Sequence, residues 1–213
     1  MSKYYFLTAS VLMLILSLVG FSDNLITDTG QASNSDPKFI IHGLFLFAWF
    51  IIFVIQTNFI RKENYKVHIK LGLAGMFVAA GVLITTLYIF MVVYKGWNVM
   101  PPNAKVNRFF MPSFALLIWL GYMNRKKVAK HKRLMYVGTL YMLGPILDRA
   151  LDEIFPDKLI SNTVGWGPFI IGFWSLFFIS LFIYDWLTLK KIHPVTYLGF
   201  IWFYIVWTIA IFI

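Results

Sequence analysis

The chain has 213 residues and a formal net charge of +10, and 60% of its residues are hydrophobic, compared with roughly 45–50% in soluble domains. A single soluble core of this size cannot bury so much apolar surface, and disorder requires low hydrophobicity. The composition therefore predicts an integral membrane protein, and the absence of Cys excludes disulfides and thiolate metal sites.

Apolar runs long enough to cross a membrane recur along the chain. Seven are predicted to span, over residues 4–21, 39–60, 69–94, 109–123, 134–154, 169–189 and 195–213. The first is alternatively a cleaved signal peptide, although its apolar run is longer than the usual 7–15 residues. The fourth begins beside Pro112, which is expected in the first turn of its helix. The predicted fold is an all-α transmembrane bundle of seven spans, or six after cleavage, in a single domain covering residues 1–213.

Basic residues are concentrated in one set of connections, which holds 13 of the Lys and Arg residues against six in the opposite set. The positive-inside rule then places the N-terminus in the cytoplasm and the C-terminus outside. The expected partners are the bilayer and anionic lipid headgroups at the cytoplasmic face, and not nucleic acid.

Small residues occur at three- and four-residue spacing in the third run, at Gly72, Gly75, Ala79 and Gly81. Such spacing lets helix backbones approach closely in lipid. We therefore expect this run to be a packing helix.

The second run carries a polar stripe of His42, Trp49 and Gln56, which are seven residues apart and share one helix face. Polar side chains in a span line a pocket or form hydrogen bonds between helices, and the sequence leaves both possibilities open.

The fifth run is interrupted by charged residues, which are Asp148, Arg149, Asp152 and Glu153. Ionised groups inside a membrane usually mark a functional site. Asp148, Arg149 and Asp152 therefore form a candidate outer ligand site with the stripe of His42, Trp49 and Gln56. Alternatively, the helix has already left the membrane at Leu147 and the charges are solvated.

Three histidines, His68, His131 and His193, stand just before helices that enter from the cytoplasmic side, and Asp185 lies one turn inside the sixth run. Together they can bind a divalent metal, or two of the histidines can ligate a b-type haem. Their flanking lysines equally suit residues at the level of the lipid headgroups.

Several short motifs follow one another in a distinctive order. They are His42-Gly43, Trp49, Gln56, His68-x-x-Leu71-Gly72, His131-Lys132-Arg133-Leu134-Met135, Gly144-Pro145, Arg149, Asp185 and His193-Pro194. In this order the chain resembles a family of small bacterial multi-span membrane proteins of unknown function, over about residues 40–200. The resemblance implies the architecture and a location in the bacterial cytoplasmic (inner) membrane, and it supplies no reaction.

Three functions are compatible with these features, and catalytic residues stay unassigned. The preferred one is binding of a small ligand or cofactor, such as haem b, inside the bundle. The others are a metal-dependent enzyme acting on lipid and a structural or assembly factor. The sequence lacks a phosphate-binding glycine loop, an H-E-x-x-H motif and a G-x-S-x-G elbow, which disfavours ATPases, zinc proteases and serine hydrolases.

Overall fold

The computed structural model describes residues 4–155 and 163–212, and in these ranges the chain is helical, without strands. The predicted all-α class is therefore confirmed. The helices group into two compact units, Met1–Tyr94 and Lys95–Ile213. A single domain over the whole chain stays a prediction.

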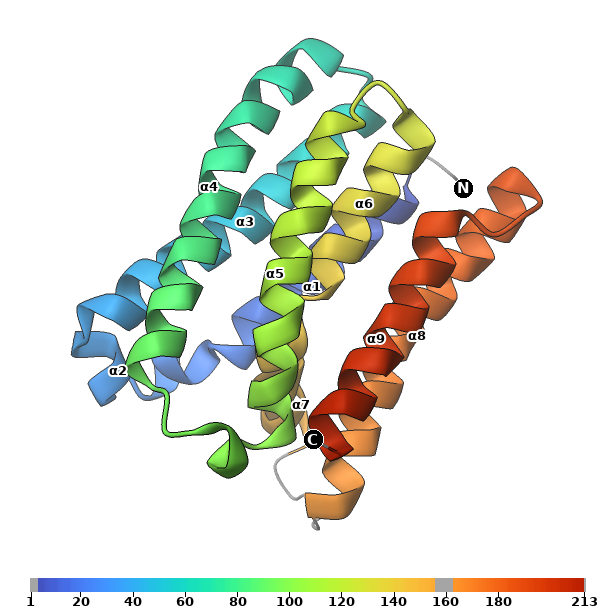
Figure 1. Ribbon diagram of the computed structural model, residues 1–213. Coiled ribbons are helices and arrows are strands. Elements are labelled where there is room, and N and C mark those ends of the chain that lie inside the picture. Colours follow the sequence, from blue (N-terminus) through green and yellow to red (C-terminus); the bar gives the residue numbers. More distant parts are fainter. Residues whose placement is uncertain (1–3, 156–162, 213) are drawn as a thin grey trace. The chain divides into compact units, whose positions relative to one another are not determined.

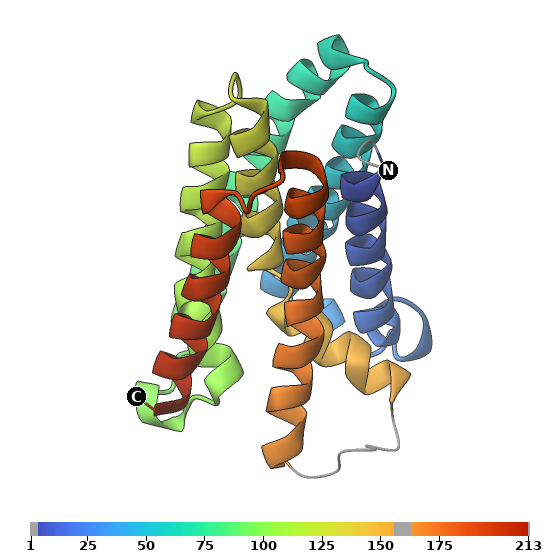
Figure 2. The ribbon, with the colours of Figure 1, turned by 90° about the vertical axis from the view of Figure 1, so that its right-hand side faces the viewer.

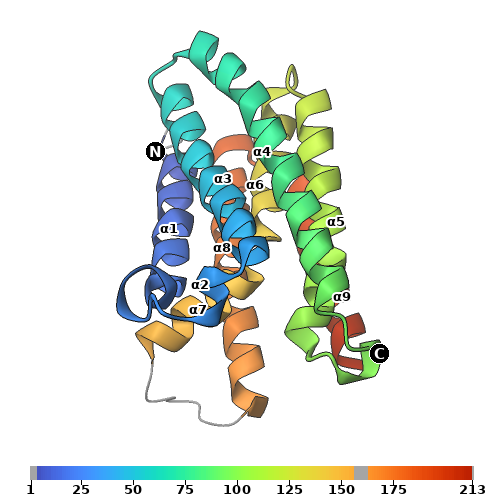
Figure 3. The same ribbon diagram turned by 90° about the vertical axis from the view of Figure 1, so that its left-hand side faces the viewer.

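The first unit contains α1 (Tyr5–Gly20), the short α2 (Ala32–Ser35), α3 (Pro37–Arg61) and α4 (Tyr65–Val92). Helices α3 and α4 form an antiparallel hairpin (Figures 1 and 3). Asp36 caps α3 by accepting the Lys38 N–H at 3.1 Å, and Pro37 stands in the first turn, where its missing N–H costs nothing. Asn64 caps α4 in the same way.

Glycine allows the close packing of α4 against α3. A Cβ atom added at Gly81 would overlap the ring of Phe45, and one added at Gly75 would lie 3.3 Å from Ile52. The expectation that this run is a packing helix is confirmed. On the other side of α3, Ser10 of α1 shares a 2.8 Å hydrogen bond with Thr57.

The second unit contains α5 (Pro102–Met123), α6 (Val128–Leu140), α7 (Gly144–Ile154), α8 (Thr163–Leu189) and α9 (Pro194–Phe212). Helices α8 and α9 form a hairpin, and α5 packs against both α6 and α9 (Figure 2).

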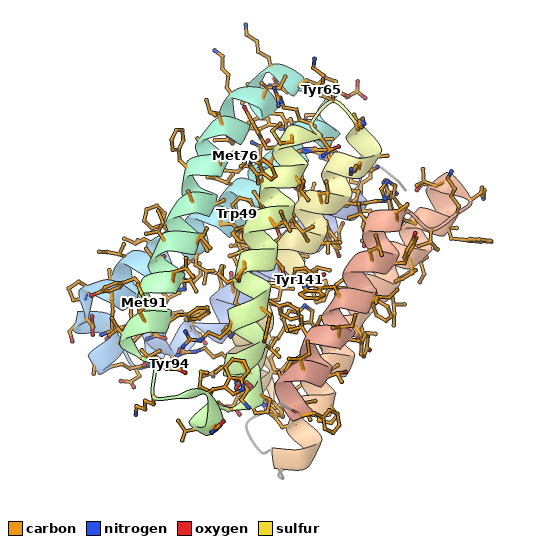
Figure 4. The ribbon with its side chains drawn as sticks, viewed as in Figure 1. Trp49, Tyr65, Met76, Met91, Tyr94 and Tyr141 are labelled. Atoms are coloured by element: carbon orange, nitrogen blue, oxygen red, sulfur yellow. The ribbon has the colours of Figure 1, made fainter. Side chains whose placement is uncertain are left out.

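Aromatic rings form the core of the second unit. Phe110 stacks between Tyr141, at 4.7 Å, and Phe203, at 5.7 Å. The hydroxyl of Tyr141 donates to the carbonyl of Gly199 at 2.8 Å, which ties the end of α6 to α9 (Figure 4). The indole N–H of Trp174 donates to the carbonyl of Leu140 at 3.0 Å. Both buried polar groups are therefore satisfied, as a core requires.

Four helical stretches in the described ranges are long and apolar enough to cross a membrane, Pro37–Arg61, Tyr65–Val92, Trp166–Leu189 and Pro194–Phe212. They support a membrane-embedded protein, whereas seven spans are not confirmed. The first run forms a helix of 16 residues. At 1.5 Å per residue this measures about 24 Å, less than the roughly 30 Å of the hydrocarbon core.

The fifth run forms two helices instead of one, because the helix is interrupted between Leu140 and Gly144. Pro145 lacks the N–H that would continue the helix, and its ring would collide with the carbonyl of Tyr141. Helix α7 then runs across the direction of α8 (Figure 2).

The fourth run begins earlier than expected. Helix α5 starts at Pro102, so Pro112 lies inside it instead of in the first turn. The Pro101–Pro102 pair provides the helix start, since a proline is pre-organised for the first turn. The polar residues 102–108, expected in a loop, form the first two turns of α5.

Candidate functional site

The N-terminal end of the polar stripe on α3 faces α4. His42 Nδ1 lies 3.0 Å from the hydroxyl of Thr85, and the same hydroxyl lies 2.8 Å from the carbonyl of Gly81. A hydrogen bond through Thr85 therefore links His42 to α4.

The C-terminal end of the stripe also faces α4. The amide of Gln56 donates to the backbone carbonyl of His68 at 3.1 Å, and Trp49 between the two polar residues is buried. Of the two possibilities left by the sequence, hydrogen bonding between helices therefore describes both His42 and Gln56.

A buried ion pair joins α6 to α8 in the second unit. Arg133 and Asp185 are both fully buried, and both the Nε and one terminal nitrogen of Arg133 donate to Oδ1 of Asp185, the Nε at 2.7 Å. The other terminal nitrogen donates to the carbonyl of Ala129 at 2.7 Å. Buried charges persist when they are paired and their hydrogen bonds are satisfied, and Arg133 meets both conditions.

The second oxygen of Asp185 closes the turn between α8 and α9. Oδ2 accepts the backbone N–H of His193 at 3.0 Å and the hydroxyl of Thr196 at 2.6 Å. One carboxylate thus connects α6, the end of α8 and the start of α9. Both of its oxygens are engaged in these contacts.

The two histidines of this unit sit at helix ends. His131 Nδ1 lies 2.8 Å from the carbonyl of Gly121, so it must donate, and it satisfies one of the last carbonyls of α5. His193 Nδ1 accepts the N–H of Val195 at 3.1 Å at the first turn of α9. Burial lowers the pKa of His131, and the hydrogen bond to Gly121 opposes this shift.

The pKa of His193 is also below its ordinary value. Burial is the largest cause, nearby Arg133 adds to it, and Asp185 acts in the opposite direction. Lys130 and Lys191 lower the pKa further through their charge. Charged side chains from α6, α8 and the α8–α9 turn therefore act together on the pKa of His193.

These contacts place the α5–α6 and α8–α9 turns at the same end of the second unit (Figure 2). We call this the basic end. It carries Arg125, Lys126, Lys127, Lys130, Lys190 and Lys191, all of them exposed except the partly buried Lys130. Residues 124–133 and 190–194 include no acidic residue, and Asp185 is already neutralised by Arg133. The basic end thus carries a net positive charge without a nearby counter-charge from its own turns.

The predicted outer charges lie on α7, which is amphipathic. Its buried face holds Ile146, Leu147, Ala150 and Leu151. Asp148 is partly buried and accepts the indole N–H of Trp166 at 3.0 Å and the amide of Asn103 at 3.3 Å. Arg149 and Asp152 are exposed. This arrangement favours the alternative in which the charges have left the apolar interior.

The structure brings the residues of the two predicted sites together only in part. His193 contacts Asp185 through its backbone, whereas His131 is bound to α5 and His68 belongs to the first unit. Among the described residues, no three His, Cys, Asp or Glu side chains are arranged to hold a metal ion. His42 and Asp148 belong to different units, so the outer site that combines them stays a prediction.

Arg133 is the residue that sequence reasoning missed, because it was treated as one of many loop cations. A usable signal was present. Arg133 just precedes the apolar run that begins at Leu134, and Asp185 lies one turn from the same end of another run. Opposite charges at equal depth in two membrane helices are expected to pair.

The apolar helices and the buried ion pair define an integral membrane protein of the all-helical class. No family model matches the chain, and neither a curated protein nor a solved structure matches it. The resemblance to the bacterial membrane-protein family stays a prediction.

Proposed function

We propose that this membrane protein binds a small anionic ligand at the basic end, and that this ligand is the phosphate-bearing headgroup of an anionic membrane lipid. The observation that carries the proposal is the cluster of exposed lysines on two turns that are joined by the Arg133–Asp185 pair. Each Lys or Arg near an anionic membrane surface contributes about 1 kcal/mol of attraction.

The cluster is held in place before any ligand arrives. Asp185 fixes the backbone at His193 and the hydroxyl of Thr196, so the turn that carries Lys190 and Lys191 cannot move independently of α6 and α9. A ligand therefore meets a turn whose backbone has already been ordered by folding, which favours binding.

The test measures binding of phosphatidylglycerol and phosphatidylcholine to the delipidated protein by native mass spectrometry. Replacing Lys190 and Lys191 by Gln should weaken phosphatidylglycerol binding about 30-fold, at about 1 kcal/mol per charge, and should leave phosphatidylcholine unaffected. The matched control replaces Lys62 and Lys66 by Gln, which removes the same charge from exposed positions of the first unit. Equal losses in both double variants, or no loss in either, would contradict a site at the basic end.

One further variant separates binding from folding. Lys190 has a φ of 54°, a left-handed conformation that favours glycine. Lys190→Gly should therefore raise thermal stability while it weakens phosphatidylglycerol binding. A variant that loses stability and affinity together would indicate that the lysine acts only through the fold.

A second candidate function, cofactor binding by His42, has its own observation. A histidine that ligates a metal or haem normally donates its other ring N–H to a protein oxygen, and the hydrogen bond between His42 Nδ1 and the hydroxyl of Thr85 suits this arrangement. If a b-type haem binds there, the purified protein should show a Soret band that His42→Ala removes and Gln56→Ala retains. A protein that lacks both the band and a bound metal would rule this candidate out.

A further inference from the structure

Helix α9 has one buried face and one open face. The buried face includes Thr196, Gly199, Phe203, Val206 and Ala210. The open face holds a groove of about 490 Å³, lined by Phe200, Ile201, Tyr204, Ile205, Thr208 and Ile209. Successive members of this set are one or three residues apart, so they form a continuous strip along the helix.

The polar atoms in this groove already have partners within the protein. The hydroxyl of Tyr204 shares a 2.9 Å hydrogen bond with Ser175, and the hydroxyl of Thr208 donates to the carbonyl of Tyr204 at 2.9 Å. Ile201 is 50% exposed and Ile205 is 43% exposed. What the groove offers a ligand is therefore apolar surface, and a hydrocarbon chain fits that chemistry.

The groove lies at the depth of one lipid leaflet below the basic end. Lys190 and Lys191 stand just before the start of α9 at Pro194. At 1.5 Å per residue, the groove runs from about 9 Å to about 22 Å along α9 from that start. One leaflet contributes about 15 Å of hydrocarbon beneath its headgroup layer, so the groove lies at the depth that the acyl chain of a lipid held at the lysines would occupy.

We propose that the groove on α9 binds an acyl chain of the same anionic phospholipid whose headgroup is held at Lys190 and Lys191. This inference rests on the proposed function, and it makes the ligand a membrane phospholipid instead of a soluble phosphate. Charge complementarity at one end of the strip and apolar surface along the rest select an amphiphile with an anionic head. Asp185 fixes the two parts relative to each other, because it binds both the turn and Thr196 of α9.

The experiment compares lipids that share a headgroup and differ in their chains. Native mass spectrometry of the delipidated protein measures the affinity for dioleoyl phosphatidylglycerol, dihexanoyl phosphatidylglycerol and glycerol phosphate. Ile205→Trp fills the groove and should weaken the dioleoyl lipid about tenfold through lost apolar contact, with glycerol phosphate unchanged. The matched control is Ile183→Trp, at an isoleucine of α8 that is 54% exposed and outside the groove.

The outcomes separate the two proposals. Loss of the dioleoyl lipid in Ile205→Trp alone supports the groove, and wild-type affinity in that variant overturns it while the headgroup site stands. If the Lys190→Gln/Lys191→Gln variant binds all three ligands normally, the proposed function itself is wrong. If Ile205→Trp does not fold, Ile201→Ala with Ile205→Ala removes the same apolar contact, and unchanged affinity for the dioleoyl lipid overturns the groove.

Discussion

Arg133 and Asp185 are two charged residues that are completely buried inside the second unit. The desolvation of such a pair offsets much of its attraction, so its net effect on stability is small compared with the effect of breaking it. Each charge is stabilised by the other, because nothing offsets the desolvation cost of a buried charge that has no partner.

A double-mutant cycle tests this dependence. Arg133→Met and Asp185→Leu should each lower the free energy of unfolding by about 3–5 kcal/mol. The double variant should lose clearly less than the sum, and the part not recovered reflects the His193 N–H and the Thr196 hydroxyl, which also bind Asp185. Thermal unfolding in detergent provides the measurement. Additive losses in the double variant would show that the two side chains stabilise the unit independently.

His131 gives the second unit a sensitivity to acid. Its pKa in the folded protein is lowered by burial, so the unfolded chain binds the proton more tightly. The contribution of His131 to stability is then complete above about pH 6.5 and is lost as the pH falls toward the lowered pKa. His131→Asn keeps a donor for the Gly121 carbonyl without titrating, and should flatten the decline in thermal stability between pH 7 and 5. An unchanged decline would assign the acid sensitivity to another group.

Single elements differ in how well their sequences predict them. Length and apolar composition were sufficient for α3, α4, α8 and α9, since each is an uninterrupted apolar run. Length and composition did not predict the boundary between α6 and α7, because the apolar sequence continues through the interruption of the helix. Gly144-Pro145 was the available signal, because this dipeptide interrupts a helix whatever the hydropathy around it.

The candidate site was predictable to a similar degree. Spacing along α3 placed His42 and Gln56 on one face, and both contact α4. Sequence gives the depth of a residue along its helix, but the direction of the side chain around the bundle depends on how the helices pack. For that reason the position of Asp185 near the end of its run could be read from the sequence, but its pairing with Arg133 could not.

The close contact between α3 and α4 makes its own prediction. Gly81→Ala should destabilise the first unit by about 1–3 kcal/mol, because the new methyl group overlaps the ring of Phe45. Gly43→Ala is the matched control, since a Cβ there meets nothing within 4 Å. In that open position, alanine should be neutral or stabilising by up to about 1 kcal/mol. Similar thermal stabilities for the two variants would show that Phe45 moves aside without cost.

At the scale of the whole molecule, the distribution of positive charge predicts the orientation in the membrane. Loops 61–70, 124–133 and 190–194 should be cytoplasmic, and the two that belong to the second unit lie at one end of it (Figure 2). A reporter that is active only in the periplasm should be inactive in these loops and active at residue 30. Periplasmic activity in the 124–133 loop would reverse the orientation.

The Arg133–Asp185 pair also has a consequence for biogenesis, because its partners are 52 positions apart in the chain. At about 5–20 residues per second, synthesis delivers Asp185 roughly 3–10 s after Arg133. During that interval Arg133 has no partner for the position that it occupies in the folded unit, where both charges are fully buried. The packing of α6 in its final place therefore has to wait for the synthesis of α8, and the second unit completes its fold as a group instead of one helix at a time.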